Sequence, residues 1–185
     1  IVAHTVFEER GGWGMEHLLA TCGLSPAAVI IGEATRGDIA IGHRGRAEVE
    51  VVLRGVAGHA SAPERALNAL DLVPPVLAAV RELAGRQGTD PLLGRASVVA
   101  TGVDVLPQSR NVIPDQVVVV LDWRVLPESD DRSLLQAVRG VLGEELPEVP
   151  SGMSVEVRMA REEQATYTGR TETRDLFTPG FLMDP

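Results

Sequence analysis

Residues 46–54 read RAEVEVVLR, and this stretch decides the fold class. Its apolar and charged residues alternate, which is the period of a β-strand with one dry face and one wet face. The residues predicted to face inward are Ala47, Val49, Val51 and Leu53. Residues 153–159 (MSVEVRM) alternate in the same way, and residues 96–105 (ASVVATGVDV) and 116–126 (QVVVVLDWRVL) supply two more strands.

Two helical stretches lie between these strands, at residues 68–85 and 130–146. Ser129 or Asp130 is placed to cap the start of the second one. The order is therefore strand, helix, strand, strand, helix, strand. We predict an α+β fold in which residues 38–160 form a ferredoxin-like βαββαβ domain, with an antiparallel four-stranded sheet and both helices on one face.

Two prolines fall inside the first helical stretch. A proline in a helix interior removes a backbone donor and clashes with the preceding turn. The helix therefore either starts at Pro74, with Pro75 in its first turn, or begins near Asn68 and kinks.

Residues 1–37 have a different pattern. Residues 1–7 (IVAHTVF) and 28–32 (AVIIG) are nearly continuous apolar runs, as in the fully buried strands of parallel sheets, and residues 14–23 between them have helical spacing. We expect residues 1–37 to be a fragment of an α/β domain whose other strands lie elsewhere. Residues 161–185 are polar and aperiodic, and we expect them to return to that domain.

The composition excludes several classes of protein. The chain has 185 residues, enough for a core, and a net charge of −9, which argues against a nucleic-acid binder with a basic face. No apolar run approaches the roughly 20 residues of a membrane span. The single cysteine, Cys22, rules out an intramolecular disulfide and fits a reducing compartment, so we expect a cytoplasmic protein with Cys22 buried.

Three carboxylates follow the apolar runs of residues 1–37. Glu8 and Glu9 come at the end of the first run, and Glu33 follows the second. Ligands bind at the carboxyl ends of strands in open α/β sheets, so the three could converge there, with a divalent metal as counter-charge. The alternative is that they are solvated glutamates at wet strand ends.

Three further side chains could carry chemistry in residues 38–160. His59 lies among small residues that let another surface approach, Asn111 is held ahead of Pro114, and Arg124 shares the open face of its strand with Asp122. An arginine in such a place can grip a carboxylate with two hydrogen bonds. The alternatives are a solvated loop histidine, a loop hydrogen bond and a surface Asp–Arg pair.

Taken together, these motifs resemble a known family. TVFEERGGWG, IIGEAT, GHRGRAEVEVVLRGVAGHASAPERALNAL, NVIPD and DWRVLP occur in the order seen in the two-zinc amidohydrolases that include succinyl-diaminopimelate desuccinylase, acetylornithine deacetylase, aminoacylase and tripeptidase T. The resemblance implies hydrolysis of amide bonds in N-acyl amino acids or small peptides, two zinc ions (or cobalt or manganese) in the full-length enzyme, and a homodimer formed through the lid domain, here residues 38–160.

The resemblance also implies a role for each candidate residue. Glu8 matches the general base, and Glu9 and Glu33 match zinc ligands. His59 matches a lid histidine that reaches across the dimer to steady the oxyanion in the partner's site. Asn111 and Arg124 match residues that hold the substrate carboxylate.

The chain also departs from the family pattern. It lacks the early His-x-Asp motif, the bridging Asp upstream of the glutamate pair and the late ligand histidine; its histidines are His4, His17, His43 and His59. We therefore expect a piece of a hydrolase, mainly its lid, that is inactive alone and holds zinc weakly at best. The alternative is a non-catalytic ferredoxin-like module for association or small-molecule sensing.

Overall fold

The computed structural model describes residues 1–8, 12–146, 148–166 and 168–183. It divides the chain into two compact units, Ile1–Ile41 and Gly42–Pro185. The domain boundaries that the sequence analysis places between residues 37 and 38 and between residues 160 and 161 stay predictions. None of the helices in the described residues is long and apolar enough to cross a membrane.

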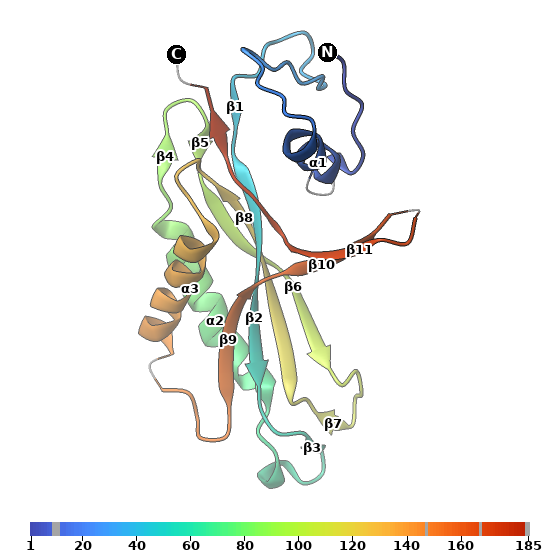
Figure 1. Ribbon diagram of the computed structural model, residues 1–185. Helices are drawn as coiled ribbons and strands as arrows, with labels where there is room; N and C mark the ends of the chain where they lie inside the picture. Colours follow the sequence, from blue (N-terminus) through green and yellow to red (C-terminus); the bar gives the residue numbers. More distant parts are fainter. Residues whose placement is uncertain (9–11, 147, 167, 184–185) are drawn as a thin grey trace. The chain divides into compact units, whose positions relative to one another are not determined.

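The second unit is built on an antiparallel sheet (Figure 1). Its four long strands are β2 (Gly45–Arg54), β6 (Ser97–Leu106), β8 (Gln116–Val125) and β9 (Ser154–Met159). They lie in the order β9-β2-β8-β6, and every neighbouring pair is antiparallel. These are the four strands that the sequence analysis predicts for this domain.

The alternation of β2 places one row of side chains in the core. Ala47, Val49, Val51 and Leu53 are fully buried, as predicted. They pack with the matching row of β8 and with the apolar faces of α2 (Val73–Gly85) and α3 (Asp131–Glu145). Figure 1 shows both helices on the same side of the sheet, so the residues that alternate with the core row, such as Glu48 and Asp122, lie on the opposite face.

The helix starts follow from local hydrogen bonds. A 3₁₀ helix, η3 (Ala69–Leu72), precedes α2, and the side chain of Asn68 accepts a hydrogen bond from the Leu70 N–H at 3.1 Å. The α-helix itself begins at Val73, so Pro74 falls in its first turn, where no intrahelical donor is needed. The helical stretch thus begins just after Asn68, as a 3₁₀ helix, and its α-helical part begins one residue before Pro74.

Helix α3 begins with a capping box. The carboxylate of Asp130 accepts from the Ser133 N–H at 2.7 Å, and the Ser133 hydroxyl accepts from the Asp130 N–H at 3.1 Å. Asp130 rather than Ser129 is thus the capping residue.

Residues after β9 form strands that the sequence pattern did not predict. A hairpin of β10 (Arg161–Ala165) and β11 (Thr171–Asp175) precedes β12 (Phe177–Thr178), which pairs with the start of β2. Gly45 permits this pairing, because a Cβ there would lie 2.3 Å from the Thr178 carbonyl oxygen.

Three short pairs complete the unit: β1 (Gly42–His43) with β13 (Phe181–Leu182), β3 (Gly58–His59) with β7 (Val112–Ile113), and β4 (Thr89–Asp90) with β5 (Gly94–Arg95). A second 3₁₀ helix, η2 (Pro63–Arg65), follows β3.

The first unit corrects three predictions. Its helix α1 (Trp13–Thr21) lies where the spacing of residues 14–23 predicts one. Residues 1–7 and 28–32, however, are not strands, and their aliphatic side chains are exposed. A strand needs a neighbour to satisfy its backbone, and the described residues supply none for these two segments. Cys22 is exposed just after α1, so the prediction that it is buried is also wrong.

Candidate functional site

Glu8 lies in the first unit. It follows Phe7, whose φ of 57° is a left-handed conformation that bulky residues rarely adopt. The Phe7 carbonyl accepts a hydrogen bond from the Gly12 N–H at 2.8 Å, and the rings of Phe7 and Trp13 pack edge to face with centroids 5.5 Å apart. Strained backbone of this kind concentrates at functional sites. The carboxylate of Glu8 is exposed, and Glu9 lies outside the described residues.

Glu33 is exposed in the same unit, and its Oε1 accepts from the Ala34 N–H at 2.7 Å. Within the described ranges, no three His, Cys, Asp or Glu side chains come close enough to hold a metal ion. The described residues alone therefore do not fit a two-metal centre. Whether Glu8, Glu9 and Glu33 converge stays a prediction, because it depends on Glu9.

The structure does bring His59 and Asn111 together. His59 ends β3 and pairs with Val112 of β7, which follows Asn111 directly, and the Asn111 carbonyl accepts from the Ala60 N–H at 3.0 Å. The side-chain oxygen of Asn111 accepts from the Ser109 hydroxyl at 2.7 Å. That bond orients the amide and leaves its NH₂ group as a donor.

The tautomer of His59 follows from one contact. The Ser61 N–H donates to Nδ1 of His59 at 3.2 Å, and the Ser61 hydroxyl lies 2.7 Å from the same nitrogen. Because a backbone N–H can only donate, Nδ1 must accept, and the proton of the neutral ring is on Nε2. His59 is exposed, and the contacts of its ring with described residues are made through Nδ1, so the Nε2–H stays available as a donor.

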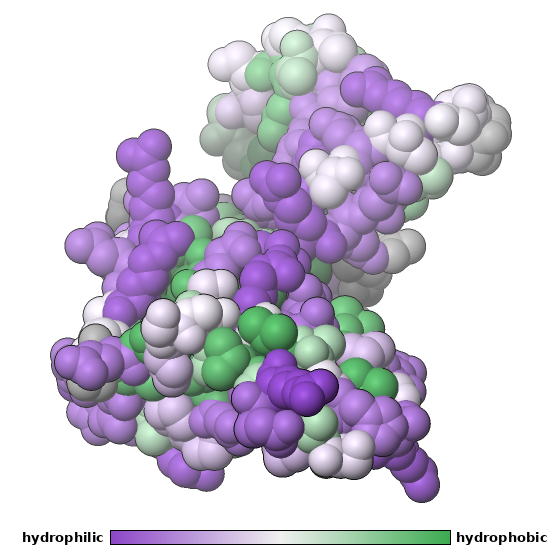
Figure 2. Space-filling view, turned by 90° about the horizontal axis from the view of Figure 1, so that it is seen from below, coloured by the Kyte–Doolittle hydropathy of each residue, from purple (hydrophilic) through white to green (hydrophobic). Residues whose placement is uncertain are grey.

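Small and apolar residues surround this histidine. Gly58 packs against Ala66, where a Cβ on the glycine would lie only 2.7 Å from the Ala66 Cβ. Val56 and Leu70 in the flanking segments keep 44% and 39% of their surfaces exposed. Figure 2 views the molecule from the end that carries β3 and β7 and shows apolar surface set among hydrophilic surface. Apolar surface rimmed by polar residues is typical of a contact site.

Arg124 lies on the face of the sheet opposite the helices, as its strand position predicts, but it is not free. Its Nε donates to Asp122 at 2.9 Å, and Arg46, directly across in β2, donates to the same carboxylate at 2.8 Å and to Glu48 at 3.1 Å. The hydrogen bond to Asp122 raises the pKa of Arg46 above its ordinary value. The surface Asp–Arg pair considered as an alternative is therefore present, and Arg46 joins it.

Arg124 and the pair of His59 and Asn111 lie at opposite ends of the sheet. Gln116, the first residue of β8, pairs with Arg54 at the end of β2 that leads into β3. From Gln116 to Arg124 the strand spans roughly 27 Å at about 3.4 Å per residue. Figure 1 shows β3 and β7 at the end of the sheet remote from β1. One chain cannot bring these three side chains to one small ligand.

Comparisons with known proteins identify the family. The sequence profile described as the peptidase dimerisation domain of the M20 type matches residues 41–150, more than half of the chain. The uncharacterized protein YgeY of Escherichia coli is 29% identical over 185 residues, which cover the whole chain and 44% of that relative. Succinyl-diaminopimelate desuccinylase of Gluconacetobacter diazotrophicus is 32% identical over 152 residues, which cover 78% of the chain and 37% of the relative. The chain thus spans less than half the length of these relatives.

Solved structures show the same fold. Aminopeptidase PepT from Bacillus cereus superposes with a TM-score of 0.55 at 17% identity, over 98% of this chain and 42% of that one. A hydantoinase/carbamoylase family amidase from Burkholderia ambifaria gives 0.53 at 17% identity, over 78% and 30%. The resemblance drawn from the sequence motifs is confirmed: the chain belongs to the M20 peptidase dimerisation domain family.

Proposed function

We propose that the whole protein is a metal-dependent hydrolase of amide bonds in N-acyl amino acids or small peptides, and that residues 38–160 are its dimerisation, or lid, domain. The family assignment and the desuccinylase names of the relatives support the reaction class. The strand order β9-β2-β8-β6, with α2 and α3 on one face, supports a ferredoxin-like arrangement for the lid.

One observation carries the proposal: the candidate substrate-binding residues lie at the two ends of one sheet. β6 runs from Ser97, opposite Arg124, to Leu106, opposite Gln116. If two copies pair antiparallel along β6 about a two-fold axis, the Ser97 end of one copy lies beside the Leu106 end of the other. The Arg124 of one copy then approaches the His59 end of its partner, and each site is built from both chains.

β6 is suited to this pairing. It is the edge strand of the sheet, ten residues long, and no described residue pairs with its outer side. Val99, Val103 and Leu106 keep 53%, 45% and 45% of their surfaces exposed. β6 has a register irregularity between Ala100 and Gly102, and its long, exposed edge on either side of it is a template for another strand.

The side chains then have complementary tasks at the composite site. The Nε2–H of His59 is available to donate to a developing oxyanion. The NH₂ group of Asn111 and the remaining donors of Arg124 bind the substrate carboxylate, while Asp122 orients the guanidinium.

The first unit contributes the acidic residues in this proposal. Glu8 is the general base, and Glu9 and Glu33 are metal ligands, as the family resemblance implies. Because the described residues group no three such ligands, the zinc centre also needs side chains from outside them.

A complementation experiment tests the proposal in the full-length, zinc-loaded protein with a panel of N-succinyl and N-acetyl amino acids and dipeptides. His59→Ala and Arg124→Ala are each expected to be nearly inactive. Mixed dimers contain one site with both residues intact, so equal mixing should restore roughly a quarter of the wild-type activity. Inactive mixtures that contain mixed dimers would show that both residues act within one chain. A wild-type protein that dimerises but hydrolyses none of the panel would favour the non-catalytic association module.

A further inference from the structure

The second edge of the sheet, β9, differs from β6. β9 pairs only with β2 among the described residues, and Ala160, just beyond it, donates to the Glu48 carbonyl at 2.8 Å. Backbone groups alternate in direction along an antiparallel strand. The N–H and C=O groups of Val155, Val157 and Met159 therefore point away from β2, toward the outside of the sheet.

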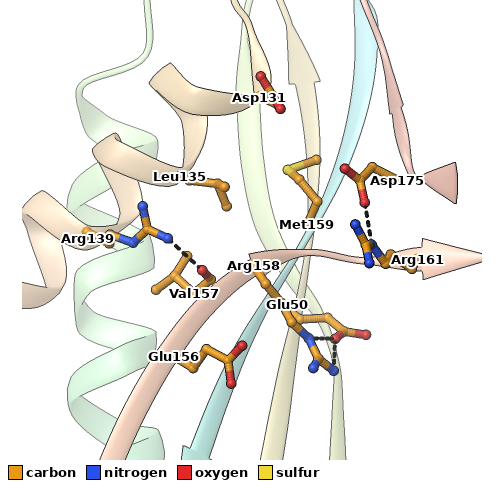
Figure 3. Close-up of a pocket in the computed structure, with 10 residues that line it drawn as sticks. All are labelled: Glu50, Asp131, Leu135, Arg139, Glu156, Val157, Arg158, Met159, Arg161 and Asp175. Carbon is orange, nitrogen blue, oxygen red and sulfur yellow. Dashed lines mark hydrogen bonds and ion pairs between the residues drawn. The ribbon is translucent and has the colours of Figure 1, made fainter.

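There is room for another strand on that side. A groove of about 580 Å³ runs along the outer side of β9, with α3 on its other wall (Figure 3). Outward backbone groups beside an open groove are the features that strand addition uses. Association through both edges would join β6 of one copy to β9 of the next, a head-to-tail contact that does not close.

Arg139 occupies this edge. It projects from α3 across the groove, and its guanidinium donates to the Val157 carbonyl at 2.9 Å, as Figure 3 shows. The other two arginines of the groove, Arg158 and Arg161, are each paired with a carboxylate at 2.7 Å. Beyond the groove, the Ala160 carbonyl is taken by the Leu176 N–H at 2.8 Å. Arg139 is thus the side chain that occupies the middle of the β9 edge.

We propose that Arg139 is an edge cap: by occupying the Val157 carbonyl and the groove beside it, it bars strand addition at β9. Copies of the chain then associate through β6 alone, and association ends at a closed dimer. The inference rests on the proposed β6 dimer for its partner, a second copy of this chain.

The test compares variants of the full chain by sedimentation velocity from low to high micromolar concentration. Arg139→Met keeps an aliphatic stem and loses the donor, whereas Arg139→Lys keeps a positively charged donor. Arg81→Met is the matched control, because Arg81 is exposed on α2 and makes no hydrogen bond or ion pair with any described residue. Of these variants, we expect only Arg139→Met to form species larger than a dimer, and the amount of these species should grow with concentration.

Hydrogen exchange gives a second readout of the same edge. In the larger species, the amides of Val155, Val157 and Met159 should become more protected than in the wild type. A cooperative thermal melt checks folding, and Arg139→Leu replaces Arg139→Met if the latter does not fold. If the wild type and Arg139→Met both form dimers and nothing larger, the edge cap is refuted and the β6 dimer is retained. If the wild type is a monomer and Arg139→Met is a dimer, the β6 dimer is refuted and the edge cap is supported.

Discussion

At the scale of single residues, two histidines have opposite tautomers. Nδ1 of His59 accepts from the Ser61 N–H, whereas Nδ1 of His43 lies 3.2 Å from the Arg44 carbonyl, which can only accept. We therefore predict that the neutral rings carry their protons on Nε2 in His59 and on Nδ1 in His43. Long-range ¹H–¹⁵N NMR spectra of the chain, with both rings neutral, measure this directly.

Ser61→Ala provides the matched control, because it removes the hydroxyl and keeps the backbone N–H. The Nε2–H tautomer of His59 should persist in this variant. If His59 shows Nδ1–H in the wild type, its Nε2–H donor and its proposed role at the oxyanion are both wrong.

A second residue-scale prediction concerns the buried indole of Trp123. Its Nε1–H donates to Gln87 at 2.9 Å, and Gln87 in turn donates to the Leu83 carbonyl at 2.8 Å, so the end of α2 is tied to β8. Gln87→Leu leaves the indole donor without its partner, which should cost about 1–3 kcal/mol in the free energy of unfolding. Urea unfolding of Gln87→Leu, Trp123→Phe and the double variant measures the free energy of unfolding of each. If the losses of the two single variants add up to that of the double variant, Gln87 and Trp123 are not energetically coupled.

Residue types were readable from the sequence, but their contacts were not. The alternation of residues 116–126 correctly placed Arg124 and Asp122 on one face. Arg46 was visible on the wet face of its own strand, yet the register that sets it opposite Arg124 depends on pairing between distant segments. Its place in the Asp122 cluster could not be predicted for that reason.

At the scale of elements, the start of α3 should respond to pH. The hydrogen bond from the Ser133 N–H lowers the pKa of Asp130 below its ordinary value. A carboxyl group with a lowered folded-state pKa stabilises the fold above its unfolded-state pKa of about 3.9, and this is lost as the pH falls through the folded-state value. Thermal melts should therefore show Asp130→Ala below the wild type at pH 7, with the gap narrowing below about pH 4.

Asp130→Asn separates capping from charge, because asparagine caps helices well and does not titrate. Its melting temperature should lie close to that of the wild type at pH 7. A gap between wild type and Asp130→Ala that stays constant down to pH 2 would contradict the capping account.

Elements were predictable where each one carries its own signal. β2 and β9 each alternate between a buried row against the helices and a charged row, so their period alone reveals them. The hairpin of β10 and β11 carries mostly charged and polar residues and depends on pairing rather than burial. Residues 1–7 and 28–32 show the reverse, a strand-like composition with no described neighbour to pair with.

At the scale of the whole molecule, the β6 edge should control association. Val103→Lys places a charge in the middle of the exposed edge, a device that blocks strand addition in natural proteins. We expect the dissociation constant of the dimer to rise at least about tenfold, because the lysine must be desolvated on pairing. Val29→Lys is the control, an exposed valine outside every strand, and sedimentation equilibrium should show it unchanged. Equal dimer stability in both variants would place the interface elsewhere.

The most direct test of the composite site is a distance between two copies. With Cys22 replaced by serine, Ala60→Cys in one copy and Ser97→Cys in the other carry a nitroxide and a gadolinium label, so that double electron–electron resonance reports only the distance between copies. The antiparallel β6 dimer predicts that this distance is shorter than the 60-to-97 distance within a doubly labelled chain. A longer distance in a dimeric sample would contradict the assembly of each site from two chains.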